Sequence, residues 1–175
     1  MTIRNGDAYR RSLQRLRPNV LKWGELIEDP TTHPATRLHV QSVATSYDAA
    51  FDPVRAPIFT ATSHLTGQPA HRWNTLLRSA EDVLGNARMK RVQFRTSGTC
   101  QGTTCAGWTG LNALWAVTHE LDAALGTDHH ARVRDYFAFV EDQGSALAGA
   151  LTDAKGNRTL RASKQPDPDS YLHVK

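Results

Sequence analysis

Apolar residues recur at the spacing of an α-helix in five stretches of the chain, which predicts a mainly α-helical protein. The first stretch follows Asn5, a possible N-cap, and ends at Pro18, and the second covers about residues 34–50. The third begins at Ser79, in a sequence that resembles a capping box, and Gly98 interrupts it. Because each helix has an apolar side, we expect them to share one core.

The other two predicted helices lie in the C-terminal half. From Ala106 to Leu125 the residues are apolar on much of the helical circumference, so we expect a central, buried helix that stops at Gly126. Thr127 and Asp128 can cap the last helix. Its predicted core stripe consists of Val133, Tyr136, Phe137 and Val140.

The remaining stretches lack helical spacing. Residues 20–28 alternate around Gly24 and predict a small hairpin, in which we expect Trp23 to pack. Residues 52–72 contain three prolines and many Ser and Thr residues, which predicts a long ordered connection over the helices. After Leu151 the chain is polar and rich in turn formers, and residues 171–174 resemble the first residues of a strand.

Composition narrows the class of protein. A chain of 175 residues with 39% hydrophobic content is long enough for one main domain with a sizeable core. It has neither an apolar run long enough for a membrane span nor a signal peptide, so we expect a cytoplasmic protein without a membrane partner. The net charge of +4 is spread along the chain and no nucleic-acid-binding module is recognisable, so we expect no nucleic-acid partner.

The two cysteines carry the most specific chemical signal. Cys100 and Cys105 lie in the stretch SGTCQGTTCAGW, with four residues between them. In a reducing compartment such a pair can be two free thiols at a helix start, a redox pair or half of a metal site. Arg95 and the start of the helix at Ala106 would both lower a thiol pKa, as redox chemistry requires. The residues leave these alternatives open.

Several blocks in order resemble one protein family. They read GDAYRRSLQ, the WGE hairpin, DPTTHPATR, SYDAAFDP, SAEDV…ARMKR, TC…CAGWTGLNALWA, HELDAALGTDHHARVRDYFAFVE, GALTDAKGNR and DPDSYLHV. They resemble the N-terminal helical region of the flavin-dependent family that contains 4-hydroxyphenylacetate 3-monooxygenase and 4-hydroxybutyryl-CoA dehydratase. The resemblance covers essentially the entire chain, and nine blocks with similar spacing are specific.

The resemblance implies an architecture like that of acyl-CoA dehydrogenases. In that architecture a helical N-terminal domain, a middle β-domain and a C-terminal helical bundle enclose FAD, usually in a homotetramer. We therefore expect residues 1–151 to form the helical N-terminal domain, and residues 152–175 a turn-rich linker and the start of a truncated β-domain. The chain would then be a fragment, a truncated product or one piece of a split enzyme, and we expect it to be inactive alone.

The dehydratase branch is favoured, because sequences similar to TDAKGNR and DPDSYLHV follow its helical region. In that branch the stretch matching SGTCQGTTC supplies two ligands of a [4Fe-4S] cluster, which makes Cys100 and Cys105 the candidate metal ligands. The dehydratase pair is separated by three residues, which places both thiolates on one helical face. Here four residues intervene, so a bulge or turn at Gly98 or Gly102 would be needed to bring the sulfurs together.

The same resemblance suggests cofactor contacts and two other functions. Arg88 and Arg91, with Lys90 between them, could contact a phosphate of FAD or coenzyme A, although a solvated helix face is the favoured explanation. The monooxygenase branch would act on a phenol, but its substrate-binding Arg and Tyr within residues 101–109 and its His within 146–151 are absent here. A stand-alone, non-catalytic helical module or remnant is the third alternative. We leave open whether this chain is itself an enzyme.

Overall fold

The structure is a computed structural model of the chain, and it describes residues 3–16, 20–98, 106–148, 157, 159–161 and 164. Within these residues helices dominate, as the sequence predicts. The α-helices are α1 (Gly6–Arg15), α2 (Arg37–Asp48), α3 (Ala56–Phe59), α4 (Ala80–Ser97), α5 (Ala106–Leu125) and α6 (His129–Asp142). Two 3-10 turns, η1 (Ala49–Phe51) and η2 (Arg72–Asn74), lie among them.

Two short antiparallel hairpins complete the described fold. β1 (Leu21–Lys22) pairs with β2 (Glu25–Leu26), which confirms the hairpin predicted around Gly24. β3 (Thr60–Thr62) pairs with β4 (Pro69–His71) inside the segment predicted as a connection. That segment therefore contains a helix and a hairpin, which its prolines and short polar residues concealed.

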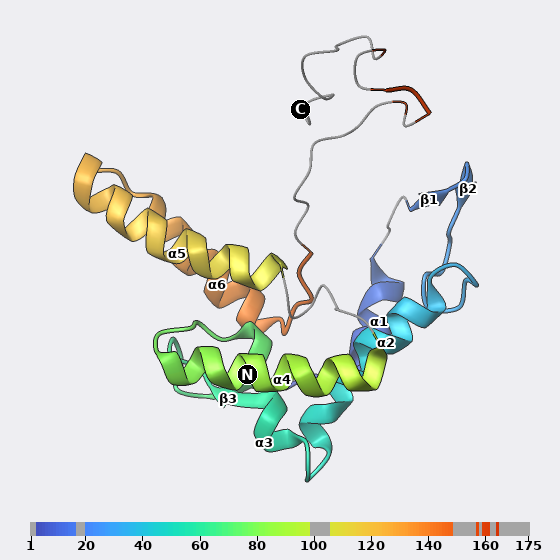
Figure 1. Cartoon of the computed structure of the whole chain (residues 1–175), viewed down its shortest axis with the longest axis horizontal. Coiled ribbons are helices and arrows are strands. Elements are labelled where there is room, and N and C mark those ends of the chain that lie inside the picture. Colours follow the sequence, from blue (N-terminus) through green and yellow to red (C-terminus); the bar gives the residue numbers. More distant parts are fainter. Residues whose placement is uncertain are drawn as a thin grey trace.

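The helices fall into two groups in space (Figure 1). α1 packs along α2, while α4 packs against the short elements α3 and η2. α5 and α6 run side by side and project from the rest as an antiparallel arm. None of the helices in the described part of the chain is both long enough and apolar enough to cross a membrane.

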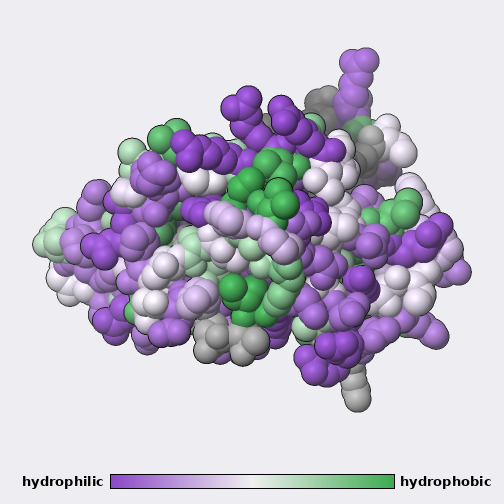
Figure 2. Space-filling model, turned by 90° about the horizontal axis from the view of Figure 1, so that it is seen from below, coloured by the Kyte–Doolittle hydropathy of each residue, from purple (hydrophilic) through white to green (hydrophobic). Residues whose placement is uncertain are grey.

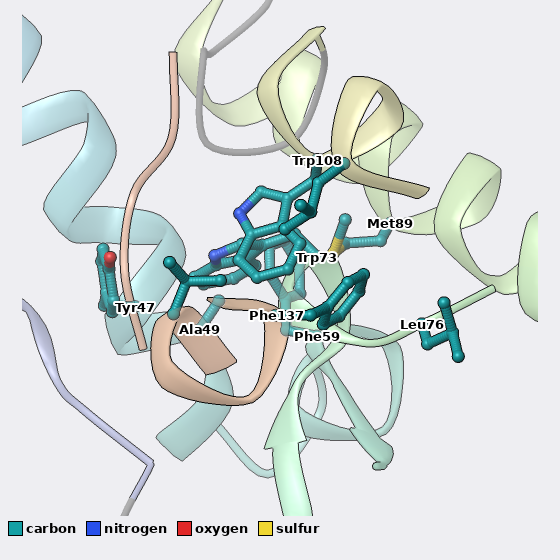
Figure 3. Close-up of a cluster of buried hydrophobic side chains, with 10 residues drawn as sticks. Tyr47, Ala49, Phe59, Trp73, Leu76, Met89, Trp108 and Phe137 are labelled. Carbon is teal, nitrogen blue, oxygen red and sulfur yellow. The ribbon is translucent and has the colours of Figure 1, made fainter. Parts of the chain in front are cut away.

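One core joins these groups where the arm meets the body (Figure 3). Trp73 and Phe59 come from the central segment, Met89 from α4, Trp108 from the start of α5 and Phe137 from α6. All five side chains are at most 2% exposed. The core therefore gathers one side of each helix, and only the base of the arm takes part in it.

Most predicted helix ends are confirmed by their capping groups. The side-chain oxygen of Asn5 accepts a hydrogen bond from the Ala8 amide, and Ser79 and Asp82 form a complete capping box. Gly98 and Gly126 follow their helices with φ of 69° and 66°, a left-handed conformation that glycine adopts without strain.

Asp128 is the N-cap residue of α6, as predicted, but its side chain does not cap the helix. The carboxylate of Asp122, on the preceding helix, instead accepts hydrogen bonds from the amides of His129 (3.0 Å) and His130 (2.7 Å). A cap from a neighbouring helix is a tertiary contact, so a local sequence pattern cannot show it.

The prediction of a buried α5 is also wrong. Leu114, Val117 and Leu125 are 52%, 56% and 68% exposed, because α6 covers only one side of the projecting helix. Tyr136, predicted in the core stripe of α6, is 50% exposed for the same reason. Apolar side chains therefore remain on the surface, where they form patches among hydrophilic residues on the face seen in Figure 2. Exposed apolar patches of this kind are typical of surfaces that pack against another protein segment.

Trp23 does not pack, contrary to expectation. It is 95% exposed at the tip of the β1–β2 hairpin. Its φ is 56° and that of Gly24 is 84°, so both turn residues are left-handed, as in a type I′ turn. A bulky residue is unfavourable in this conformation, whereas Asn tolerates it.

Replacing Trp23 by Asn should therefore stabilise the hairpin locally, by about 0.5–1 kcal/mol relative to Trp23→Ala. Hydrogen exchange of the Ile27 amide, which donates to the Val20 carbonyl at 2.9 Å, reports on this hairpin. We expect exchange to be roughly two- to fivefold slower in Trp23→Asn than in Trp23→Ala. Equal rates in the two variants would show that the left-handed backbone is not the constraint.

Candidate functional site

The predicted metal ligands Cys100 and Cys105 lie outside the described residues, so their ligand role stays a prediction. The structure does define the two points from which their segment departs. α4 ends at Ser97 with Gly98 as its cap, and α5 begins at Ala106. Among the described residues, no group of three or more His, Cys, Asp or Glu side chains could hold a metal ion.

A close backbone contact lies directly beside this segment. A β-carbon built on Gly107 would lie 2.7 Å from Leu147 Cβ and 2.8 and 2.9 Å from the Leu147 carbonyl carbon and oxygen. Only glycine fits there without a shift of the backbone. Gly107 and Leu147 belong to residues 101–109 and 146–151, the two stretches that the resemblance associates with substrate in the monooxygenase branch.

Trp108, the residue after Gly107, anchors this contact in the core. It is 2% exposed, and its ring meets Phe137 edge to face with centroids 5.3 Å apart. The Asn112 amide group donates to the Trp108 carbonyl at 2.9 Å, and its oxygen accepts from the Leu77 amide at 2.8 Å. The start of α5 is thereby tied both to the core and to the segment before α4.

Side chains from the body hold the chain after α6 in place. The Tyr47 hydroxyl donates to the Gly144 carbonyl at 2.8 Å, and the Asn74 amide donates to the Ser145 carbonyl at 3.2 Å. Both residues are fully buried. Such buried bonds stabilise because leaving the carbonyls unpaired would cost about 1–3 kcal/mol each.

An aromatic stack surrounds these hydrogen bonds. Tyr9 stacks on Tyr47 with centroids 4.9 Å apart, and His71 stacks on Trp73 at 4.3 Å. Tyr47 meets both His71 and Trp73 edge to face. The indole N–H groups of Trp73 and Trp108 have no hydrogen-bond partner within the described ranges, and Figure 3 shows both indoles in one cluster.

Burial keeps the ionisable groups of the stack neutral. Desolvation raises the pKa of both Tyr9 and Tyr47, and it lowers the pKa of His71 to about 4. His71 Nε2 lies 2.9 Å from the Arg4 carbonyl, so this nitrogen carries the hydrogen and donates it. On α6, burial likewise raises the pKa of Glu141, against the opposing influence of the Ser63 hydroxyl.

A hollow of about 470 Å³ opens between α1 and the chain after α6. Its walls combine two guanidinium groups, two phenols and an amide with apolar side chains. The lining residues are Arg4, Tyr9, Ser12, Leu13, Arg15, Leu16, Tyr47, Phe139, Gln143, Ser145 and Ala146. Its volume lies within the range of small-molecule sites, but its lining is more polar than is typical of them.

The candidate phosphate contacts lie elsewhere. Arg88 and Arg91 are exposed on α4, and Arg88 pairs with Glu81 at 3.9 Å. Arg88 also borders a smaller hollow of about 280 Å³ that contains Arg72 and the carboxylates of Glu81 and Asp82. The guanidinium of Arg72 is already bound to the carbonyls of Pro57, Ile58 and Thr60. The contact of Arg88 and Arg91 with a cofactor stays a prediction.

Comparison with known proteins identifies the family. Residues 5–175 match the family model described as 4-hydroxyphenylacetate 3-hydroxylase N terminal. The chain belongs to this family. The resemblance deduced from the nine sequence blocks is thereby confirmed.

The relatives of this chain include two kinds of enzyme, a dehydratase and an oxygenase. The chain is 32% identical over 172 residues to the 4-hydroxybutyryl-CoA dehydratase/vinylacetyl-CoA-Delta-isomerase of Clostridium aminobutyricum, covering 98% of this chain and 35% of that protein. It is 30% identical over 173 residues to the 4-hydroxyphenylacetate 3-monooxygenase oxygenase component of Thermus thermophilus, covering 98% and 34%. The chain thus spans about a third of the length of these relatives.

Solved structures show the same two kinds of enzyme. An oxygen-tolerant archaeal 4-hydroxybutyryl-CoA dehydratase from N. maritimus superposes with a TM-score of 0.82 at 36% identity, over 96% of this chain and 33% of that one. The oxygenase component HpaB of 4-hydroxyphenylacetate 3-monooxygenase, complexed with FAD, gives 0.68 at 27% identity, over 94% and 34%. The helical fold of this N-terminal family is therefore confirmed.

Sequence reasoning missed most of the residues that shape the site. Tyr9 and Tyr47 lie in two stretches of helical spacing, a pattern that predicts a packed side chain and nothing about a site. His71 and Asn74 follow a segment rich in Thr, Ser and Pro that carries no periodic signal. One sequence signal points to the close contact at Gly107, namely a glycine in the first turn of an apolar helix.

The close contact at Gly107 predicts a stability difference between two glycines of the same helix. Gly107→Ala should lower the free energy of unfolding by about 1–3 kcal/mol, because the new methyl group overlaps Leu147 backbone atoms. Gly110→Ala is the matched control, since nothing lies within 4 Å of its β-carbon position. We expect it to raise stability by up to about 1 kcal/mol in urea unfolding, and equal effects would refute the contact.

The neutral state of His71 predicts a pH dependence. In the unfolded chain His71 takes up a proton near pH 6.5, whereas the folded protein resists it until about pH 4. Stability from this residue is therefore complete above pH 6.5 and falls between pH 6.5 and 4, by on the order of 3 kcal/mol. His71→Gln should flatten this part of a urea-unfolding pH profile.

His39→Gln, an exposed site on α2, is the control and should leave the profile unchanged. A His71→Gln profile that runs parallel to that of the unmodified chain would show that His71 is not the group responsible.

Proposed function

We propose that this chain forms the N-terminal wall of the FAD and substrate pocket in a flavin-dependent enzyme of the dehydratase-like kind, acting on a hydroxyacyl-CoA. The observation that carries the proposal is similarity to two 4-hydroxybutyryl-CoA dehydratases, at 32% and 36% identity, over 98% and 96% of the chain. A flavin is included because a solved oxygenase of the same fold is complexed with FAD. The architecture shared with acyl-CoA dehydrogenases and a homo-oligomeric state are parts of the proposal.

The geometry supports a pocket wall at the start of α5. Gly107 and Leu147 are in contact, and they belong to the two stretches that the resemblance associates with substrate in the monooxygenase branch. Tyr47 and Asn74 bind the carbonyls of Gly144 and Ser145, directly before the second stretch, so buried hydrogen bonds set the point from which this stretch starts. A wall of this kind orients a bound molecule because its own backbone cannot shift easily.

Cys100 and Cys105 are the proposed cluster ligands, and cysteine thiolates are the donors that iron–sulfur clusters require. Two cysteines cannot fill the ligand set of a cluster alone, so we propose that the remaining ligands come from other parts of the complete enzyme. When bound, the cluster would supply a Lewis acid for a leaving hydroxyl group, beside the one-electron chemistry of the flavin.

Arg88 and Arg91 would hold a phosphate of FAD or of coenzyme A. The ion pair of Arg88 with Glu81 is long and solvent-exposed, so it contributes little stability, and a phosphate can replace it. Because the two arginines lie three residues apart on α4, they reach the same side of the helix.

The oxygenase function is the second candidate, supported by 30% identity to the Thermus thermophilus protein. It is disfavoured because the Arg, Tyr and His expected from that branch are absent from residues 101–109 and 146–151. Without them a phenolate would lack charge-assisted hydrogen bonds there.

An exchange of domains tests the proposal. Residues 5–175 replace the matching third of the N. maritimus dehydratase, and the chimera is assayed for dehydratase activity, FAD content and iron content. We expect an active, FAD-containing chimera. Cys100→Ser or Cys105→Ser should lower activity by more than about a hundredfold and release iron, because even outer-shell changes at metal sites cost 10–100-fold. Thr104→Ala, within the same segment, is the control.

A second set of variants tests the flavin contact. Arg88→Gln and Arg91→Gln should weaken FAD or coenzyme A binding by the chimera, whereas Lys90→Gln should not. A folded, FAD-containing chimera without dehydratase activity would overturn the proposed substrate class. Activity of the matching chimera with the oxygenase would favour the second candidate instead, and a chimera without FAD would favour a non-catalytic module.

A further inference from the structure

Two histidine rings lie close together between the two helices of the projecting arm. His119 lies on α5 and His130 in the first turn of α6. Their ring centroids are 5.3 Å apart and the ring planes are nearly perpendicular, at 83°. The sequence alone does not relate these two residues, because their side chains come from different helices and meet only when the arm folds.

Thr118 determines which nitrogen of His130 is available. Its hydroxyl donates to the Leu114 carbonyl at 2.7 Å, so the oxygen is left to accept from His130 Nδ1 at 3.2 Å. His130 Nδ1 therefore carries the hydrogen, and Nε2 keeps its lone pair. A hydrogen bond to one ring nitrogen that exposes the other as a ligand is typical of metal-binding histidines.

The ring of His130 is also held in place by its surroundings. Trp115 meets it edge to face with centroids 4.7 Å apart. The Asp122 carboxylate accepts the His130 amide hydrogen at 2.7 Å and so anchors the first turn of α6. The ring loses little conformational freedom when it binds a ligand, which favours binding.

The distance between the rings fits two ligands of one metal ion. A metal–nitrogen bond of about 2.0–2.1 Å places the ion about 3.2 Å from the centre of each imidazole ring. Two such ligands at a tetrahedral angle then have ring centres about 5.2 Å apart. The observed 5.3 Å agrees with this spacing.

We propose that His119 and His130 bind one divalent transition-metal ion of the class that prefers imidazole, namely Cu²⁺, Ni²⁺ or Zn²⁺. No third His, Cys, Asp or Glu of the described chain joins them, so water completes the coordination and the ion exchanges with solvent. The ion would link α5 to α6 near the far end of the arm. The order of affinities for such ligands makes Cu²⁺ the tightest of the three. This site is independent of the function proposed above.

Copper titration of the untagged chain tests the site. Cys100→Ser and Cys105→Ser are introduced first, so that thiolates cannot compete for the ion. Cu²⁺ at the site should quench the fluorescence of Trp115, which contacts His130, and the electron paramagnetic resonance spectrum should show coupling to two imidazole nitrogens. His119→Ala should weaken this binding by more than about tenfold, since the exposed residue leaves the fold unchanged.

His129→Ala is the matched control, because His129 is an exposed neighbour of His130. The His129→Ala variant should bind Cu²⁺ with the same affinity as the parent chain that carries Cys100→Ser and Cys105→Ser. Thr118→Val, which removes the acceptor for His130 Nδ1, should weaken binding, and Thr118→Ser should restore it. Equal affinity in His119→Ala and the parent, or equal losses in His119→Ala and His129→Ala, would overturn the proposal.

Discussion

The described fold depends on how the chain after α6 returns to the body. The Tyr47 hydroxyl and the Asn74 amide bind the carbonyls of Gly144 and Ser145, and Leu147 then lies on the bare backbone of Gly107. These contacts join α2, the segment before α4 and the start of α5 at one point. Because the hydrogen bonds are buried, each would cost far more to break than an exposed bond. The aromatic core packs against this point.

The same contacts fix the start of α5, where the segment with Cys100 and Cys105 ends. The segment with Cys100 and Cys105 starts from the capped end of α4 and leads into α5. The first turn of α5 contacts Leu147 through Gly107, and its Trp108 is buried in the core. Similarity to dehydratases and oxygenases of about three times this length agrees with a wall that other parts of an enzyme complete. The exposed apolar residues of α4, α5 and α6 agree with such a role.

Local signals in the sequence predicted the secondary structure well. Asn5, Ser79, Gly98 and Gly126 mark helix ends because capping and left-handed glycines act within a few residues. The same reasoning failed for Trp23, α5 and Asp128. Whether an apolar side chain is covered depends on neighbours that are distant in the sequence, and the carboxylate that caps α6 belongs to the preceding helix, whose position the local pattern does not give.

The sequence by itself determined the helices, most of their ends and, through nine ordered blocks, the family. Only the tertiary structure decided that Gly107 meets Leu147, that His71 is buried and neutral, and that His119 faces His130. The physical reason is range. Capping and periodic burial act between residues a turn or two apart, whereas close backbone contact, desolvation and paired ligands arise only when distant segments pack together.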